Sequence, residues 1–455
     1  MWPTNKKTRF SFFIMLADVL VINLGIILAY LIRFRMELPI YNFRPYMEMC
    51  LWISLGSLFI LNMYQLYSVS ARTRWEDQFY SIVIAVTLIM MLSISLTYIS
   101  ANFAFPRSVF LLSGLLQVVI LLLWRYLLWR MTKRALGFQK AIVIGSHTDI
   151  VEMATRIQEF SESHITIVGL ITDETVQAEI RSGNLRILGE VSQFESILDS
   201  TDYDVAVVTP SVDVHLKEKI VCHCYSIGKE VFLIPDLYEV LLLKAELNIL
   251  DDIPVFTIKD YNGDNTQLKR VLDFAIGCFA FVFTLPIMAV IALFIKLDSS
   301  GPAIYRQERV TKGGKIFVLY KFRTMVQDAE AGTGPVFAVE EDQRATKVGR
   351  ILRLSRLDEL PQFINVIKGD MSLVGPRPER PFFVEQFSKE IRGYDNRHRM
   401  KPGITGIAQI AGKYNTGPRE KLVFDLLYAK KSDILVDLQI LLQTVKVLFM
   451  RDKAS

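Results

Sequence analysis

The chain has 455 residues, of which 51% are hydrophobic and 22% are charged, and its formal net charge is +5 at pH 7. This length allows two to four domains, and the large hydrophobic share indicates a protein with membrane segments rather than a fully soluble one. The modest net charge gives no reason to expect a nucleic-acid partner. The four cysteines show no disulfide framework and no complete set of metal ligands.

Four apolar stretches come first, at residues 10–32, 49–66, 79–99 and 108–129. Each is about 20 residues long, which is enough to cross a bilayer as a helix. Lysine and arginine are concentrated before the first stretch, between the second and third, and after the fourth. The positive-inside rule therefore places the N-terminus and the segment after Trp129 in the cytoplasm. We expect a bundle of four transmembrane helices over residues 1–135.

Two charged residues lie within these apolar stretches, Asp18 in the first and Arg125 in the fourth. A charge at the middle of a membrane costs about 2.5–3.5 kcal/mol on insertion scales, so each side chain needs a partner or a route to water. A contact between the two within the bundle would satisfy both. Snorkelling of Arg125 to the cytoplasmic face is at least as good an alternative.

Residues 136–256 alternate apolar strands, at 140–146, 164–172, 203–210 and 229–235, with amphipathic helices. This pattern predicts a doubly wound, Rossmann-like α/β domain. The dinucleotide fingerprint is absent, because Gly145 stands alone where three glycines are needed. We favour an inherited fold without its cofactor, with binding of a nucleotide or effector at the strand ends as the alternative.

A polar linker at residues 257–267 leads to an apolar segment at residues 268–295. Basic residues flank this segment on both sides, which places both of its ends on the cytoplasmic face. Pro286 lies near its middle, where it removes a backbone hydrogen bond and favours a kink. We therefore expect a re-entrant helix that enters one leaflet and returns, rather than a fifth span.

Residues 303–325 predict a β-hairpin that projects three cations, Arg306, Lys321 and Arg323. Any of them could meet a phosphate, and their number favours that role over solvated ion pairs. Arg353 lies on the helix that follows.

Asp358 and Glu359 are adjacent carboxylates that precede an apolar helical pattern, which stops at Gly369. They are expected near a helix N-terminus, where backbone N–H groups favour anions. A carboxylate nucleophile, a second carboxylate for a divalent metal and fixed cations are the parts that phosphoryl transfer needs. Helix capping is the alternative role for Asp358, because Ser355 and Asp358 match a capping box.

The turn that follows reads Gly375-Pro376-Arg377-Pro378. The two prolines restrict the backbone on both sides of Arg377 and present a forked guanidinium suited to phosphate. Residues 385–399 predict an amphipathic helix whose basic end, from Arg397 to Arg399, suits anionic lipid headgroups as well as a catalytic role. Further helices are expected at residues 420–430 and 434–449.

The motifs YKFRTM at 320–325, DELPQ at 358–362 and KGDMSLVGPRP at 368–378 resemble the bacterial sugar transferases of the monotopic phosphoglycosyl transferase family. More narrowly, the chain resembles the large members, the polyprenyl-phosphate hexose-1-phosphate transferases of exopolysaccharide, capsule and O-antigen synthesis. The resemblance covers about residue 268 to the C-terminus. It implies a monotopic α+β catalytic domain that faces the cytoplasm from the inner membrane of a bacterium.

The resemblance also implies that Asp358 attacks the β-phosphate of a UDP-sugar and releases UMP. Undecaprenyl phosphate or another polyprenyl phosphate would then take the sugar phosphate from Asp358. Glu359 matches the family's acid that binds Mg²⁺. Its phosphate-contacting positions are matched by the following residues: Arg377, Arg353, Lys321 and Arg323.

Asp425 and Tyr428 match a D-x-x-Y pattern of the family, to which the sequence alone assigns no role. Arg356 and Ile407 differ from the residues most common in the family at these positions. They leave the identity of the donor sugar open, although the resemblance favours glucose or galactose. A homodimer stays open.

Two other functions compete with this one. A membrane-anchored nucleotide-sugar dehydratase or epimerase would share the four spans and the α/β domain, but it needs a glycine fingerprint and a Tyr/Lys pair. Tyr225 and Lys229 have the spacing of such a pair, yet Gly228 would break the helix that they need. A non-catalytic assembly protein would use the C-terminal domain only to bind lipid or partners.

Overall fold

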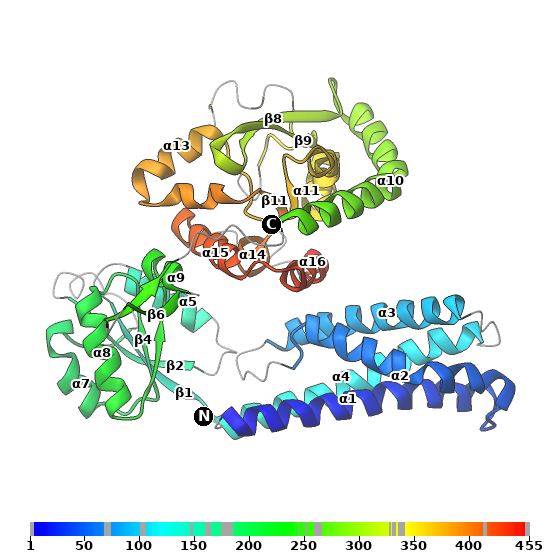
Figure 1. Ribbon diagram of the computed structural model, residues 1–455, viewed down its shortest axis with the longest axis horizontal. Helices are drawn as coiled ribbons and strands as arrows, with labels where there is room; N and C mark the ends of the chain where they lie inside the picture. The colour runs from blue at the N-terminus through cyan, green and yellow to red at the C-terminus, as the bar shows by residue number, and fades with distance from the viewer. Residues whose placement is uncertain are drawn as a thin grey trace. The chain divides into compact units, whose positions relative to one another are not determined.

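The computed structural model describes residues 4–67, 74–100, 106–145, 149–159, 165–173, 185–243, 245–250, 253–258, 266–326, 329, 334, 342–412 and 416–450. The chain divides into two compact units, Met1–Pro235 and Asp236–Ser455. Figure 1 shows the helices and strands of both units.

The first unit begins with four long helices: α1 (Thr4–Arg33), α2 (Ile40–Met63), α3 (Trp75–Ile99) and α4 (Arg107–Leu136). They lie side by side in Figure 1 and pack around a core that includes Tyr30, Ile53 and Val109. All four are long and apolar enough to cross a membrane. Helix α2 begins at Ile40 rather than at residue 49, because Arg44 and Pro45 interrupt the apolar pattern without ending the helix.

Asp18 and Arg125 form an ion pair between α1 and α4, and both side chains are buried. Arg125 also donates to the Leu66 carbonyl and lies over the Tyr67 ring, 5.3 Å from its centroid. The expected contact is therefore confirmed. Arg125 is only 5% exposed, so it does not snorkel to the surface of the bundle.

The rest of the first unit is a five-stranded parallel sheet with the order β3-β2-β1-β4-β5. Its strands are β1 (Gln139–Ile144), β2 (Ile165–Ile171), β3 (Ile187–Gly189), β4 (Val205–Val208) and β5 (Glu230–Leu233). Four of them match the expected strands. The three-residue β3 was not anticipated, because so short a run carries no periodicity.

Helices cover both faces of this sheet, which confirms the doubly wound pattern. On one face, α5 (Asp149–Glu159) packs against Ala141 and Val143. On the other, α7 (Phe194–Ser200) and α8 (Val214–Ser226) pack against Ile142 and Ile144. Successive residues of a strand face opposite sides of the sheet, so β1 contributes side chains to the packing on both faces.

The Tyr225 and Lys229 pair does not form a reductase-type site. Helix α8 ends at Ser226, and Gly228 adopts φ +70° just beyond it. Tyr225 is 86% exposed, whereas Lys229 donates to the Tyr203 carbonyl at 2.5 Å. The two side chains therefore do not share a helix face, and the dehydratase or epimerase alternative loses its acid–base pair.

The second unit begins with α9 (Leu237–Leu242) and the antiparallel pair β6 (Glu246–Leu250) and β7 (Ile253–Thr257). Sequence patterns had assigned residues up to 256 to the α/β domain. The structure groups these residues with the C-terminal part, because Val240 is fully buried against Phe383, Phe387 and Leu422.

The apolar segment forms α10 (Thr266–Asp298), a helix with Pro286 inside it. Figure 1 shows that α10 changes direction along its length. Pro286 has no N–H to donate to the Val282 carbonyl, and Thr284 donates its hydroxyl to the Ala280 carbonyl at 2.7 Å, so the local bonding pattern accommodates a bend. Its large apolar side chains are mostly exposed, among them Phe279, Val282, Phe283, Val290, Leu293 and Phe294. Such an exposed apolar surface is typical of a membrane protein.

The charged residues at the start of α10 attach it to the rest of the second unit. Lys269 pairs with Asp437, and the Leu373 N–H donates to Asp273 at 3.2 Å. Arg270 donates to the last carbonyls of the helix at residues 363–368, at 2.6 and 2.8 Å. The polar start of the segment therefore anchors the apolar remainder.

The remaining elements are β8 (Ile304–Val310), η3 (Lys312–Gly314), β9 (Ile316–Phe322), α11 (Lys347–Ser355), η4 (Leu357–Gln362), α12 (Phe363–Lys368), β10 (Ser372–Val374), α13 (Pro381–Glu390), η5 (Tyr394–Arg399), β11 (Gly403–Thr405), α14 (Ile407–Ala411), α15 (Pro418–Lys431) and α16 (Ile434–Leu448). Strands β8 and β9 form the expected antiparallel hairpin, and β10 pairs with β11 in parallel. The helix expected over residues 385–399 is interrupted, because Gly393 adopts φ +81° between α13 and η5. The core of this region includes Leu319, Val366, Val374 and Ile440.

Candidate active site

Asp358 and Glu359 lie in the first turn of η4, which continues into α12. The expected position near a helix N-terminus is therefore confirmed, as is the end of α12 at Gly369, which has φ +92°. Arg356 joins α11 to η4 with φ +55°, a conformation that costs a residue with a side chain about 1–2 kcal/mol. The Glu359 N–H donates to its carbonyl at 3.2 Å, so this strained residue is part of the turn that holds the carboxylates.

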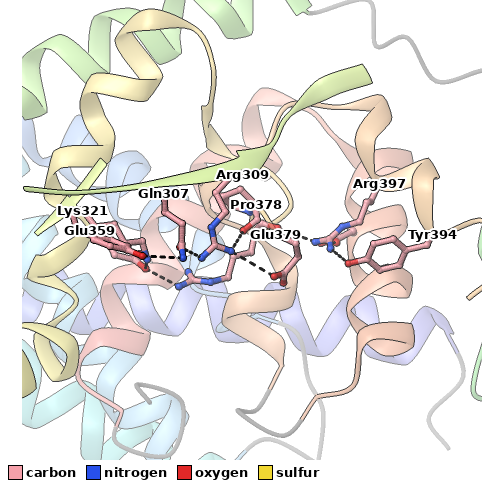
Figure 2. Close-up of polar contacts among 11 residues, drawn as sticks. Gln307, Arg309, Lys321, Glu359, Pro378, Glu379, Tyr394 and Arg397 are labelled. Atoms are coloured by element: carbon pink, nitrogen blue, oxygen red, sulfur yellow. Dashed lines mark hydrogen bonds and ion pairs between the residues drawn. The ribbon is translucent and has the colours of Figure 1, made fainter. Parts of the chain in front are cut away.

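Glu359 binds two cations from distant parts of the chain. Its Oε1 accepts a hydrogen bond from Lys321 Nζ on β9 at 3.0 Å, and a second from Arg377 Nη2 at 2.9 Å. Figure 2 shows the contact between Lys321 and Glu359 at one end of a longer row of polar side chains. Lys321 and Arg377 are two of the cations that the sequence had selected, and the fold brings both to one carboxylate oxygen.

The two carboxylates differ in their ionisation. Burial raises the pKa of Glu359, but the charges and hydrogen bonds of Arg377 and Lys321 outweigh it and hold the pKa well below its usual range. For Asp358, burial is the largest cause and the negative charge of Glu359 adds to it, so its pKa is raised despite the nearby cations. The pKa values of the two carboxyl groups are therefore shifted in opposite directions, and Asp358 is the more basic of the two.

Asn365 fixes the distance between β9 and the carboxylates. It is fully buried on α12, where its Oδ1 accepts from the Tyr320 N–H at 3.1 Å and its Nδ2 donates to the Val318 carbonyl at 2.7 Å. These bonds hold α12 against β9, and Lys321 is the next residue of that strand. Sequence reasoning missed Asn365, although an asparagine within an apolar helical pattern is the kind of signal that could have found it.

The turn that carries Arg377 is tightly packed. Pro376 and Pro378 are buried while Arg377 is exposed, as expected for prolines that present the residue between them. The Gly375 N–H donates to the Thr405 carbonyl at 2.9 Å. A Cβ atom at Gly375 would lie 2.4 Å from the Lys401 carbonyl oxygen, so only glycine allows this approach.

Arg309 holds the C-terminal side of this turn. Its Nη1 donates to the Pro378 carbonyl at 3.0 Å, and its Nη2 donates to Gln307 at 2.6 Å. Glu379 lies 3.7 Å from the guanidinium, and Figure 2 shows the group together. Sequence reasoning did not select Arg309, because an arginine on a strand gives no sign of the carbonyl it will reach.

Arg397 holds the other carbonyl of the turn. Its Nη2 donates to the Arg377 carbonyl at 2.9 Å, it also donates to the Tyr394 hydroxyl, and it forms an ion pair with Asp425 at 2.8 Å. Arg397 is only 3% exposed. Of the two roles that the sequence left open, lipid contact does not apply to Arg397, because the interrupted helix turns this side chain inward.

The other selected cations do not reach the carboxylates. Arg306 pairs across the hairpin with Tyr320, whereas Lys321 pairs with Tyr305, so Arg306 and Lys321 face opposite sides. Arg323 is buried and donates to Ser299 at 2.8 and 2.9 Å. Arg353 lies half-buried on α11. Within the described part of the chain, no hydrogen bond or ion pair joins these three arginines to Asp358 or Glu359.

The two carboxylates suit a magnesium ion whose other ligands are substrate phosphates and water. Among the described residues, no group of three or more His, Cys, Asp or Glu side chains is placed to hold a metal. Mg²⁺ is usually bound through one or two carboxylates, with substrate phosphates and water completing its octahedron. Glu359, whose pKa is lowered and which lies beside a second carboxylate, fits this requirement.

Comparisons with known proteins show the family of this chain. The bacterial sugar transferase family matches residues 264–451. One relative is the UDP-N-acetylgalactosamine-undecaprenyl-phosphate N-acetylgalactosaminephosphotransferase of Aeromonas hydrophila. It is 43% identical to this chain over 184 residues, and the aligned region covers 40% of this chain and 43% of that protein. This chain is 37% identical over 271 residues to the UDP-glucose:undecaprenyl-phosphate glucose-1-phosphate transferase of Escherichia coli K12, covering 58% and 57% of the two chains.

The aligned regions thus span about half the length of these two relatives. A third relative, the UDP-glucose:undecaprenyl-phosphate glucose-1-phosphate transferase of Caulobacter vibrioides, is 40% identical over 191 residues, which cover 41% of this chain and 71% of that protein. The family match includes the carboxylate pair, the hairpin and the Gly-Pro-Arg-Pro turn. This protein is a member of the bacterial sugar transferase family.

Proposed function

We propose that this protein transfers a sugar-1-phosphate from a UDP-sugar to undecaprenyl phosphate, releases UMP, and so begins the synthesis of a surface polysaccharide. The proposal rests on the half-buried pair of Asp358 and Glu359, with Lys321 and Arg377 both bound to Glu359. The names of the related transferases support the two substrates. The reaction would take place at the cytoplasmic face of a bacterial inner membrane, because nucleotide sugars are available in the cytoplasm.

In the first step, a carboxylate oxygen of Asp358 attacks the β-phosphorus of the UDP-sugar. A phosphorus–oxygen bond forms, the bond between this phosphorus and the bridging oxygen breaks, and UMP leaves with the electron pair. In the second step, a phosphate oxygen of undecaprenyl phosphate attacks the same phosphorus and Asp358 leaves as a carboxylate. The raised pKa of Asp358 favours this role, because a more basic carboxylate is a better nucleophile.

An anionic nucleophile and an anionic donor repel each other, so the site must supply positive charge. Arg377 is 46% exposed and can contact a diphosphate while it remains beside Glu359, and Lys321 lies on the other side of the same oxygen. When bound at Glu359, Mg²⁺ would neutralise charge on the diphosphate as a Lewis acid.

The donor sugar is expected to be a hexose. The family resemblance favours glucose or galactose, and the names of two relatives give glucose and N-acetylgalactosamine. We expect purified full-length protein with Mg²⁺ and undecaprenyl phosphate to release UMP from one of UDP-glucose, UDP-galactose and UDP-N-acetylgalactosamine. Without undecaprenyl phosphate, the same donor should give a burst of UMP no larger than the amount of enzyme. No UMP from any donor in the complete mixture would reject the proposal.

We also propose that α1–α4 span the membrane and that α10 is re-entrant. The exposed apolar surface of α10 and the bend near a central proline support this arrangement. In a chain without its native cysteines, single cysteines at Gln267 and Ser300 should both react with an impermeant maleimide in inside-out vesicles only. A cysteine at Ser100, between α3 and α4, serves as the control and should react in right-side-out vesicles only. Labelling of the cysteines at positions 267 and 300 from opposite sides of the membrane would show that α10 is a fifth span instead.

A further inference from the structure

The D-x-x-Y pattern places two buried polar side chains on one face of α15. Asp425 is 3% exposed and Tyr428 is also 3% exposed. Residues three apart on a helix lie on the same face, so both side chains point toward the same part of the domain. That part is the segment from Val374 to Arg377, at the end of β10, which contains the exposed arginine of the candidate site.

Asp425 reaches this segment through Arg397. The Arg397 guanidinium donates to the Arg377 carbonyl at 2.9 Å and lies 2.8 Å from the Asp425 carboxylate. Both charged side chains are almost fully buried. A buried ion pair adds little net stability over well-packed apolar residues, so its presence here is better explained by the geometry it imposes.

Tyr428 reaches the same segment from the other end. Its hydroxyl lies 3.1 Å from the Val374 carbonyl and 2.6 Å from Asp437, and it accepts a hydrogen bond from Lys269 at 3.2 Å. The backbone of the turn is thus contacted by groups held by α15 both before Gly375 and after Pro376.

Arg377 needs such support because its own side chain is weakly restrained. It is 46% exposed, and Glu359 is the side chain with which it forms a hydrogen bond in the described structure. The direction of its guanidinium therefore depends on the orientation of its backbone. An error of about 1 Å in a group that contacts substrate can cost on the order of 100-fold in rate.

We propose that Asp425 and Arg397 are positioning residues for Arg377: the pair holds the Arg377 carbonyl so that the guanidinium stays on Glu359 and meets the diphosphate of the donor. Tyr428 holds the Val374 end of the same turn. The assignment of the diphosphate rests on the proposed function, whereas the restraint on the turn does not.

Arg397→Lys tests the role of the Asp425–Arg397 pair. A lysine keeps the positive charge beside Asp425 but lacks the second guanidinium N–H group needed to reach the Arg377 carbonyl as well. We expect kcat/KM to fall about 10- to 100-fold. In an Arg377→Ala background, the same change should cost less than about twofold, because the group that it positions is absent. Arg392→Lys, an exposed arginine between α13 and η5, is the matched control and should leave both backgrounds unchanged.

A purely structural role would lower the melting temperature and cost the same factor in both backgrounds, which would overturn the proposal. If Arg397→Lys does not fold, Asp425→Asn carries the same comparison. Hydrogen exchange of the peptide spanning residues 374–380 provides a readout that does not depend on turnover. It should be faster in Arg397→Lys than in the parent and Arg392→Lys, and unchanged exchange would overturn the restraint even if the protein proves to have another activity.

Discussion

Asp358→Asn is expected to abolish transfer, with a loss of about 10⁴-fold or more in kcat, which is typical for removal of a covalent nucleophile. The amide has nearly the same shape and keeps the turn intact, but its oxygen is a far weaker nucleophile than a carboxylate. The loss should therefore occur without a matching loss of thermal stability. UMP release by the variant at the parental rate would exclude Asp358 as the nucleophile, whereas the non-catalytic alternative requires that the parent also releases no UMP.

The covalent intermediate can be observed directly. With a radiolabelled sugar donor and no undecaprenyl phosphate, the parent should retain label on a peptide that contains Asp358, and addition of undecaprenyl phosphate should remove it. Asp358→Asn should retain none. Turnover by the parent without label at Asp358 would exclude the two-step route.

Glu359→Gln is the informative comparison, since it changes the adjacent carboxylate and leaves the nucleophile in place. We expect label to remain on Asp358, transfer to be slower, and a higher Mg²⁺ concentration to be needed for half-maximal rate. The change also removes the negative charge that holds Lys321 and Arg377. Identical Mg²⁺ titrations in this variant and the parent would contradict the proposed metal site.

Breaking the ion pair between Asp18 and Arg125 is expected to lower the free energy of unfolding by about 3–5 kcal/mol. Asp18→Leu leaves Arg125 buried among α1 and α4 without its counter-ion, which is the costly arrangement. The double variant with Arg125→Met replaces both charges by apolar groups and should recover most or all of this loss, because neither group then needs a partner.

Unfolding of the purified protein in detergent would measure these differences. Arg44→Met is the control, because Arg44 forms an exposed pair with Glu48 and such pairs contribute about 0–1 kcal/mol. Equal stability of the parent and Asp18→Leu would show that water or lipid headgroups satisfy Arg125, as the snorkelling alternative requires.

Local features of the chain were predictable because their causes are local. Hydrophobic runs of membrane length, alternation in the strands and the glycines that end helices depend on neighbouring residues alone, so α1–α4, the parallel sheet and the β8–β9 hairpin follow from the sequence. The same holds for the two prolines around Arg377, whose rigid rings act on adjacent bonds.

The partners within the site were not predictable in the same way. The register of the hairpin places Lys321 and Arg306 on opposite faces, so that Lys321 and not Arg306 faces Glu359, and a slip of one residue would put both on the same face. Asn365 and Arg309 act on backbone carbonyls and amides, which every residue possesses, so no pattern of side chains reveals these contacts.

By itself, the sequence determined the family, the membrane character and the identity of the two carboxylates, since these depend on composition and on residues close together in the chain. Only the tertiary structure decided which cations meet Glu359, and that Arg397 contacts both Asp425 and the Arg377 carbonyl. The reason is that each of these contacts joins residues at least 18 positions apart in the chain, whose approach is set by packing of the whole domain rather than by local conformation.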